Sequence, residues 1–240
     1  LPHVSLQAPD EWVQQYAGQF SEHPYYGQQG YAAAKYPLST YAAMISFLDA
    51  QVGMIMDKIK KLGLDENTII MFSSDNGATF NVGGVDRQFF NSNGGLRGAK
   101  MDLFEGGIRE PFIARWPGKI PAGKTSNLVS AQFDIMATLA ELTGQKVTNT
   151  DGISLLQELK GNKAAQKQHP YLYFEYPEKG GQLAIRMGNW KGIKTDVRQH
   201  PEKKWMLFDL KTDRNETTDI AAAHPEIIER FEAIVKKEHR

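Results

Sequence analysis

A carboxylate beside an amide, Asp75-Asn76, is the pair of side chains in this sequence best suited to hold a metal ion. The pair directly follows residues 68–73, a β-branched and aromatic run typical of a buried strand, and ligands in open α/β folds bind at the carboxyl ends of strands. Such oxygen donors suit a hard cation such as calcium or magnesium. Because Asp-Asn-Gly also forms ordinary turns, the tripeptide by itself favours a turn over a metal site.

Three cationic side chains, Arg97, Lys100 and Arg109, lie in the glycine-rich segment of residues 96–109. Closely approaching backbone together with cations can hold an oxyanion. The alternative is a solvated loop in which neighbouring acidic residues pair with the arginines, and the residues alone slightly favour it. The segment is therefore a candidate anion site that needs support from elsewhere in the sequence.

Histidine is the usual proton shuttle near neutral pH, and the chain has six. His169 precedes a proline at the entry to a strand, which favours a structural hydrogen-bonding role over catalysis. His3 stands in a compact segment between Pro2 and Pro9, whose prolines favour an extended or turning path, and it remains a candidate for chemistry. The others are expected at the surface: His23, His200, His224 and His239.

An α/β layer is expected to position these side chains. Apolar residues recur every three or four positions over residues 41–62, which predicts a helix capped by Ser39 or Thr40 and closed by a left-handed Gly63. Residues 68–73 should then form a strand covered on both faces in a parallel sheet. Helix, tight turn and buried strand together make an α/β unit.

The later part of the chain is expected to change to a small antiparallel sheet. A strand over residues 111–116 and a short helix over residues 133–142 continue the α/β layer. Strands without long helices between them follow, so we expect antiparallel pairing of residues 171–176, 183–195 and 205–210. A helix after Pro225 should cover one face of this sheet. The expected domains are an α/β domain over residues 1–165 and a small α+β subdomain over residues 166–240.

Charge and composition exclude several classes of protein. The 28 basic and 28 acidic residues balance to a formal charge of zero, with a pI near 7.2, so no broad field would attract nucleic acid or an anionic membrane. The apolar residues are dispersed, without the run of roughly 20 that a membrane span requires. Because the chain has no cysteine, it has no disulfide, no thiolate nucleophile and no sulfur-based zinc site.

Many short motifs, taken in order along nearly the whole chain, resemble the C-terminal half of type I, formylglycine-dependent sulfatases of the alkaline-phosphatase superfamily. The resemblance is closest to bacterial arylsulfatase-like enzymes. It is carried by Pro2-His3, Leu6-Gln7-Ala8-Pro9, Phe72-Ser73-Ser74-Asp75-Asn76-Gly77, Leu96-Arg97-Gly98-Ala99-Lys100, Glu105-Gly106-Gly107-Ile108-Arg109, Trp116-Pro117-Gly118, Asp151-Gly152-Ile153-Ser154-Leu155 and Met187-Gly188-Asn189-Trp190-Lys191. The resemblance implies part of an alkaline-phosphatase-like sheet with flanking helices.

The resemblance also implies a role for each candidate side chain. Asp75 and Asn76 look like two of the calcium ligands that orient the sulfate oxygens. Lys100 looks like the sulfate-binding lysine, and His3 like the histidine that contacts the sulfate or protonates the leaving alcohol. A divalent cation and a compact ammonium would stabilise charge on the oxygens of a sulfate ester during hydrolysis.

The chain departs from the family pattern because it lacks the nucleophile. In that pattern the nucleophile is a formylglycine made from Cys or Ser in a Cys/Ser-x-Pro-x-Arg motif of the N-terminal half, and this sequence has no such motif. The paired aspartates that complete the calcium site belong to the same missing half, and two ligands fall short of the roughly six oxygens that calcium requires. Glu110 stands where the family usually has an apolar residue. We therefore expect a sulfuric ester hydrolase of which this chain supplies only part of the active site.

The expected partners are a sulfated small molecule or carbohydrate and the missing N-terminal half of the same protein, and the resemblance implies a periplasmic or secreted location. One rival is a phosphomonoesterase or phosphonate hydrolase of the same superfamily. Others are a noncatalytic carbohydrate-binding or scaffold fragment and a structural calcium module. The candidate substrate loops, residues 80–93 and 175–182, are too generic to select the sulfate ester.

Overall fold

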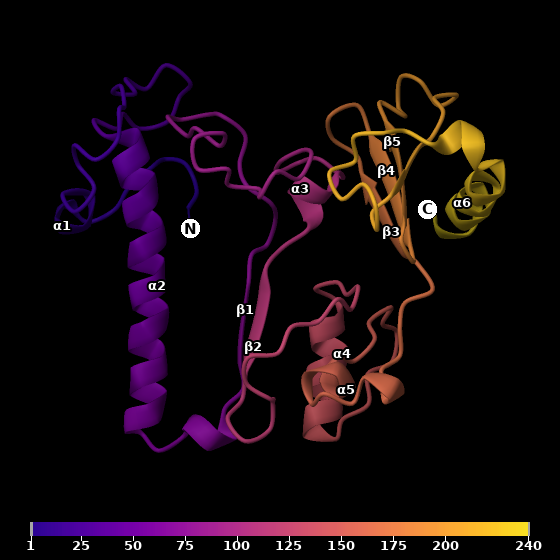
Figure 1. The fold of residues 1–240 in the computed structure, drawn as a ribbon, viewed down its shortest axis with the longest axis horizontal. Helices are drawn as coiled ribbons and strands as arrows, with labels where there is room; N and C mark the ends of the chain where they lie inside the picture. Colours follow the sequence, from indigo (N-terminus) through magenta and orange to yellow (C-terminus); the bar gives the residue numbers. More distant parts are fainter. Residues whose placement is uncertain (1, 240) are drawn as a thin grey trace. The chain divides into compact units, whose positions relative to one another are not determined.

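The computed structural model describes residues 2–239, and its contacts divide the chain into two compact units (Figure 1). Unit 1 comprises Leu1–Asp65 and Asp75–Glu110, and unit 2 comprises Glu66–Ser74 and Pro111–Arg240. Each unit has a hydrophobic core of its own. The expected domain boundary between residues 165 and 166 lies within unit 2 and stays a prediction.

Unit 1 is built on the long helix α2 (Pro37–Lys61), against which the short helix α1 (Asp10–Val13) packs. The predicted helix is confirmed, and it begins one turn earlier because Pro37 fits the first helical turn. The predicted cap by Ser39 or Thr40 is wrong. Instead, the carboxylate of Glu22 accepts hydrogen bonds from the backbone N–H groups of Leu38 at 2.6 Å and Ser39 at 3.2 Å.

The other end of α2 is closed as predicted. Gly63 adopts a left-handed conformation with φ of 70°, and the N–H of Leu64 donates to the Ile59 carbonyl at 3.1 Å. By length and composition α2 is apolar enough to cross a membrane. A core helix meets the same criterion, and the first two turns of α2 are buried in unit 1. The predicted absence of a membrane span therefore stays a prediction.

The core of unit 1 joins α2 to two loops, the N-terminal loop that carries His3 and the loop of residues 80–93. Tyr41 and Met44 of α2 pack with Leu6, three residues after His3, and with Val85 of the 80–93 loop. The ring of Tyr41 also stacks on Phe90 with centroids 5.3 Å apart. One face of the helix therefore anchors both loops. Unit 1 also contains the single-turn helix α3 (Glu105–Ile108).

Unit 2 begins with a pair of antiparallel strands, β1 (Ile70–Ser73) and β2 (Phe112–Arg115), seen side by side in Figure 1. The prediction of a parallel arrangement is wrong for this pair, because Ser73 lies opposite Phe112. The chain leaves β1 and returns to β2 at the same end, which forces the two strands to run in opposite directions. The strands are half-buried or exposed rather than covered on both faces.

The predicted antiparallel sheet near the C-terminus is confirmed, but residues 183–195, predicted as one strand, form two strands that are joined by a tight turn. Its strands follow the order β3 (Leu172–Tyr176), β4 (Gln182–Met187), β5 (Trp190–Thr195) and β6 (Met206–Asp209). Helix α6 (Pro225–Glu238) lies beside the sheet in Figure 1. Its buried Ile227 and Phe231 pack in the same core as Ile185 and Leu207 of the strands. The helix therefore covers one face of the sheet, as predicted.

Unit 2 also contains several short helices, the first of which begins at Asp65, the last residue of the preceding segment of unit 1. They are η1 (Asp65–Asn67), α4 (Asp134–Thr143), α5 (Leu156–Leu159), η2 (Lys163–Ala165) and η3 (Ala221–Ala223). Helix α4 is the predicted helix of this region, and it ends at a left-handed Gly144 with φ of 68°.

Gly192→Ala is expected to lower the free energy of unfolding by about 1–3 kcal/mol, because it overpacks the core between the sheet and α6. A Cβ atom at Gly192 would lie 2.3 Å from Cε2 of Phe231, whose side chain is fully buried. Urea unfolding of the chain measures the change. The matched control is Gly53→Ala in α2, where a Cβ atom meets nothing within 4 Å, and it should be neutral or stabilising. Equal effects at both positions would contradict the packing argument.

Candidate active site

The turn formed by Asp75, Asn76 and Gly77 follows β1 directly and is held against α3. The N–H of Gly77 donates to the Gly107 carbonyl at 3.0 Å. A Cβ atom at Gly77 would lie 2.0 Å from the Gly106 carbonyl oxygen, so only glycine fits there. The side-chain amide nitrogen of Asn76 donates to the Gly77 carbonyl at 3.0 Å. Close backbone approach thus fixes the direction in which the two polar side chains leave the strand.

The Asp75 carboxylate is exposed and, within residues 2–239, has no hydrogen-bond or ion-pair partner. Its oxygens and the amide oxygen of Asn76 are hard donors of the kind that calcium prefers. The described residues contain no group of three or more His, Cys, Asp or Glu that could hold a metal ion. The donor set therefore fits calcium in kind but is incomplete in number.

Lys100 is attached to the same region through its backbone. Its N–H donates to the carbonyl of Ala78 at 2.8 Å, three residues after Asp75. The carboxylate of Asp102 accepts a hydrogen bond from the Ala99 N–H at 2.9 Å and closes the turn in which the lysine lies. The half-buried lysine is therefore held on the segment that carries the candidate metal ligands.

The imidazole of His3 lies against the ammonium of Lys100, with Nε2 of the histidine 3.1 Å from Nζ of the lysine. Nδ1 of His3 is 2.5 Å from its neighbour's carbonyl, that of Val4. Because a carbonyl only accepts hydrogen bonds, Nδ1 carries the proton, and Nε2 of the neutral ring accepts from the lysine ammonium. Two side chains 97 positions apart in the sequence thus share a hydrogen bond.

The structure brings two of the four candidate side chains into direct contact, His3 and Lys100. It joins Lys100 to the segment that follows Asp75 and Asn76 through one backbone hydrogen bond, to the Ala78 carbonyl. The roles of all four residues remain predictions. For Arg109, which directly follows α3, the predicted alternative of a pairing with a neighbouring acidic residue holds, because it forms an ion pair with Glu105 at 3.5 Å. Arg97 packs over the ring of Phe104, 4.0 Å from its centroid.

Glu110 is a residue near this site that the sequence did not single out for function. Its Oε1 atom is buried without a hydrogen-bond partner among residues 2–239. Burial, followed by the negative charge of Asp75, raises the pKa of the Glu110 carboxyl to about 7. The sequence did contain one indication of this residue, because Glu110 stands where the family resemblance leads one to expect an apolar side chain.

In a calcium-free buffer with chelator, the free energy of unfolding is expected to fall as pH rises from about 4.5 to about 7. The pKa of Glu110 is higher in the folded chain, at about 7, than its ordinary value of 4.5, so the folded state binds the proton more tightly over this range. Glu110→Gln should remove this contribution. Urea unfolding at several pH values measures it, with Glu229→Gln on the exposed part of α6 as control. An unchanged pH dependence in Glu110→Gln would contradict the assignment.

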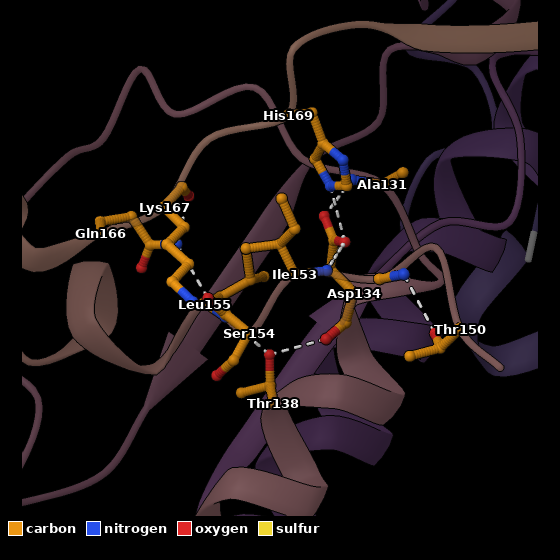
Figure 2. A network of polar contacts seen from close by, with 11 residues as sticks. Ala131, Asp134, Thr138, Thr150, Ile153, Ser154, Leu155, Gln166, Lys167 and His169 are labelled. Atoms are coloured by element: carbon orange, nitrogen blue, oxygen red, sulfur yellow. Dashed lines mark hydrogen bonds and ion pairs between the residues drawn. The ribbon is translucent and has the colours of Figure 1, made fainter. Parts of the chain in front are cut away.

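A second polar network lies in unit 2 around the fully buried Asp134, as Figure 2 shows. Its carboxylate is 2.8 Å from Nε2 of His169 and accepts the N–H groups of Ala131 and Ile153, each also at 2.8 Å. Thr138 donates to the Asp134 carbonyl at 2.7 Å. These bonds join the start of α4 to the segments that carry Ile153 and His169, so the predicted structural role of His169 is confirmed.

Several solved structures share this fold. Ps i-CgsB matches 98% of this chain and 47% of its own, with a TM-score of 0.77 and 27% identity. The same protein in complex with k-i-k-neocarrahexaose matches with a TM-score of 0.78. A phosphonate monoester hydrolase from Silicibacter pomeroyi matches 83% of this chain with a TM-score of 0.63 and 21% identity, a likeness in fold alone. The architecture is therefore the alkaline-phosphatase-like fold of sulfatases.

Sequence comparison defines the family more closely. The Sulfatase family model matches residues 2–145, and the model described as N-sulphoglucosamine sulphohydrolase, C-terminal, matches residues 99–239. The chain is 32% identical over 222 residues to an N-acetylgalactosamine-6-O-sulfatase of Bacteroides thetaiotaomicron, covering 85% of this chain and 42% of that protein. It is 31% identical over 241 residues to human arylsulfatase A, covering 89% and 46%. The chain belongs to the sulfatase family and spans less than half the length of these relatives.

Proposed function

We propose that this chain is part of a hydrolase that cleaves a sulfate ester into an alcohol or phenol and inorganic sulfate. The observation that supports this most directly is the 3.1 Å contact between the imidazole of His3 and the ammonium of Lys100. A proton-transferring ring and a compact cation are the two groups that a leaving oxygen and a sulfate anion need. Membership of the sulfatase family supports the same reaction.

In the proposed reaction, Lys100 binds the nonbridging oxygens of the sulfate group and offsets the charge that develops on them. His3 lies beside it, with Nδ1 held by the Val4 carbonyl and Nε2 accepting the hydrogen bond from the Lys100 ammonium. When the ammonium turns to the sulfate oxygens, Nε2 takes a proton from solvent and gives it to the leaving oxygen. The lysine therefore orients the ester while the histidine stabilises the departing alcohol.

Asp75 and Asn76 are proposed to hold a calcium ion together with ligands from outside this chain. The ion, when bound, would withdraw negative charge from the sulfate oxygens. The Asp75 carboxylate, which is unpaired among residues 2–239, and the oxygen chemistry of the pair support this assignment. The nucleophile, a formylglycine by family resemblance, is likewise proposed to come from the missing N-terminal half. The chain alone is then expected to be inactive.

The proposed substrate class is a sulfated carbohydrate. It rests on similarity to proteins named as N-acetylgalactosamine-6-O-sulfatase and to one solved in complex with k-i-k-neocarrahexaose. We also propose a periplasmic or secreted location, which the family resemblance implies.

Turnover of 4-nitrophenyl sulfate and 4-nitrophenyl phosphate by the 240-residue chain and by the complete protein tests the proposal. We expect the complete protein to hydrolyse the sulfate ester and the 240-residue chain to be inactive. Calcium chelation should abolish the activity of the complete protein. Faster turnover of the phosphate ester would favour the phosphomonoesterase alternative. Sugar binding without turnover of either ester would favour a noncatalytic carbohydrate-binding protein.

A further inference from the structure

The carbonyl of Gly98, two residues before Lys100, is a point at which the preceding loop holds the turn that carries the lysine. This oxygen accepts hydrogen bonds from Nη1 of Arg87 and from the side-chain amide of Asn93, the latter at 3.1 Å. The same Asn93 amide donates to the Leu96 carbonyl. Gly98 has φ of 84°, and a Cβ atom there would lie 2.9 Å from Cβ of Phe104. The turn thus depends on a glycine and on two donors from the preceding loop.

The backbone of Arg87 is held by two hydrogen bonds, which place its side chain for this contact. Its backbone N–H donates to the Asn81 side chain at 3.0 Å, and its carbonyl accepts from the Ser92 N–H at 3.1 Å. The half-buried guanidinium has no carboxylate partner within residues 2–239, and its described contact is the Gly98 carbonyl. A cation that donates to a carbonyl makes a stronger hydrogen bond than a neutral donor. These contacts distinguish Arg87 from an arginine whose guanidinium is only solvated at the surface.

We propose that Arg87 is a positioning residue that keeps Lys100 in contact with His3. The connection runs from the guanidinium to the Gly98 carbonyl and, two residues on, to Lys100, whose ammonium reaches His3. Asn93 supports the same carbonyl. This inference rests on the proposed function of Lys100 in sulfate binding. It assigns to the 80–93 loop the positioning of a catalytic cation, in addition to any contact with substrate.

The kinetic test compares Arg87→Met, which keeps length but removes the donors, with Arg87→Lys, which keeps a cationic donor. In the complete protein, Arg87→Met is expected to lower kcat for a sulfate ester at least tenfold, because small displacements of a catalytic group are costly. KM should change less, and Arg87→Lys should recover part of the loss. The control is Arg230→Met, which removes an exposed arginine from α6. Unchanged kcat in Arg87→Met would overturn the proposal.

A second measurement separates this inference from the proposed function. In the 240-residue chain, the rate at which acetic anhydride acetylates Lys100 is compared with that of the exposed Lys124 by mass spectrometry. Arg87→Met should raise the Lys100 rate relative to Lys124 at least threefold, since the ammonium is no longer held on His3. An unchanged ratio would refute the positioning role even if the wild-type protein hydrolyses no sulfate ester.

Because Arg87→Met could impair folding, Asn93→Ala serves as an independent variant that removes the other donor to the Gly98 carbonyl. It should raise the Lys100 acetylation ratio in the same direction. A uniform rise at all lysines, with a lowered unfolding midpoint, would instead indicate a purely structural role and would count against the proposal.

Discussion

Lys100→Met in the complete protein is expected to lower kcat for a sulfate ester by about 10²- to 10³-fold, the size of loss seen when one preorganised charge-stabilising group is removed. The ammonium of Lys100 is the cationic group that the structure holds on the imidazole of His3, at 3.1 Å. Methionine keeps most of the chain length and removes the charge and the hydrogen-bond donors. The expected loss therefore reports on charge stabilisation rather than on packing.

Steady-state kinetics with 4-nitrophenyl sulfate measures this effect, and Lys124→Met provides a matched control. Lys124 is exposed in a loop of unit 2, so its replacement should leave kcat and KM unchanged. Inorganic sulfate should also inhibit Lys100→Met less strongly than the wild type, because the product shares the anion site. A variant with wild-type kcat would rule out Lys100 as the sulfate-binding cation.

Asp134→Ala is expected to lower the free energy of unfolding by about 3–5 kcal/mol, because it leaves several buried donors without an acceptor. The carboxylate is fully buried and accepts bonds from Ala131 N–H, Ile153 N–H and the His169 ring. Asp134→Asn should be less severe, since one oxygen remains, but its NH₂ group would face an N–H donor. The affected residues belong to unit 2, whereas the candidate residues His3 and Lys100 belong to unit 1.

Urea unfolding monitored by fluorescence and by circular dichroism measures the loss. Asp151→Ala, which removes an exposed carboxylate from the loop after α4, should change stability by no more than about 0.5 kcal/mol. Similar stability of Asp134→Ala and the wild type would mean that water or rearranged backbone replaces the carboxylate.

Local periodicity predicted most of the elements correctly because their signals lie within a few residues. The apolar repeat after Pro37 gives α2, and Gly63 and Gly144 end helices in left-handed conformations. Alternation of apolar strands with polar turns gives the antiparallel sheet β3–β6 and its covering helix α6. Motifs in a fixed order identified the sulfatase family and the residues of the candidate site.

Contacts between distant segments could not be predicted from local patterns. Glu22 caps α2 from 16 positions away, in place of the nearby Ser39 or Thr40. β1 and β2 pair antiparallel because a loop of about forty residues returns the chain to the end it left. Arg87 and Asp134 look like ordinary charged residues in the sequence, and their partners appear only when the chain is folded.

The amino-acid sequence by itself determined the family, most of the longer helices and strands, and the four polar side chains on which a sulfatase site would depend. These features follow from residue types and spacings within short segments of the sequence. Tertiary structure alone decided that the imidazole of His3 accepts a hydrogen bond from Lys100 and that Glu110 has a raised pKa. Hydrogen bonding and desolvation depend on distances between atoms far apart in the sequence, and only folding sets those distances.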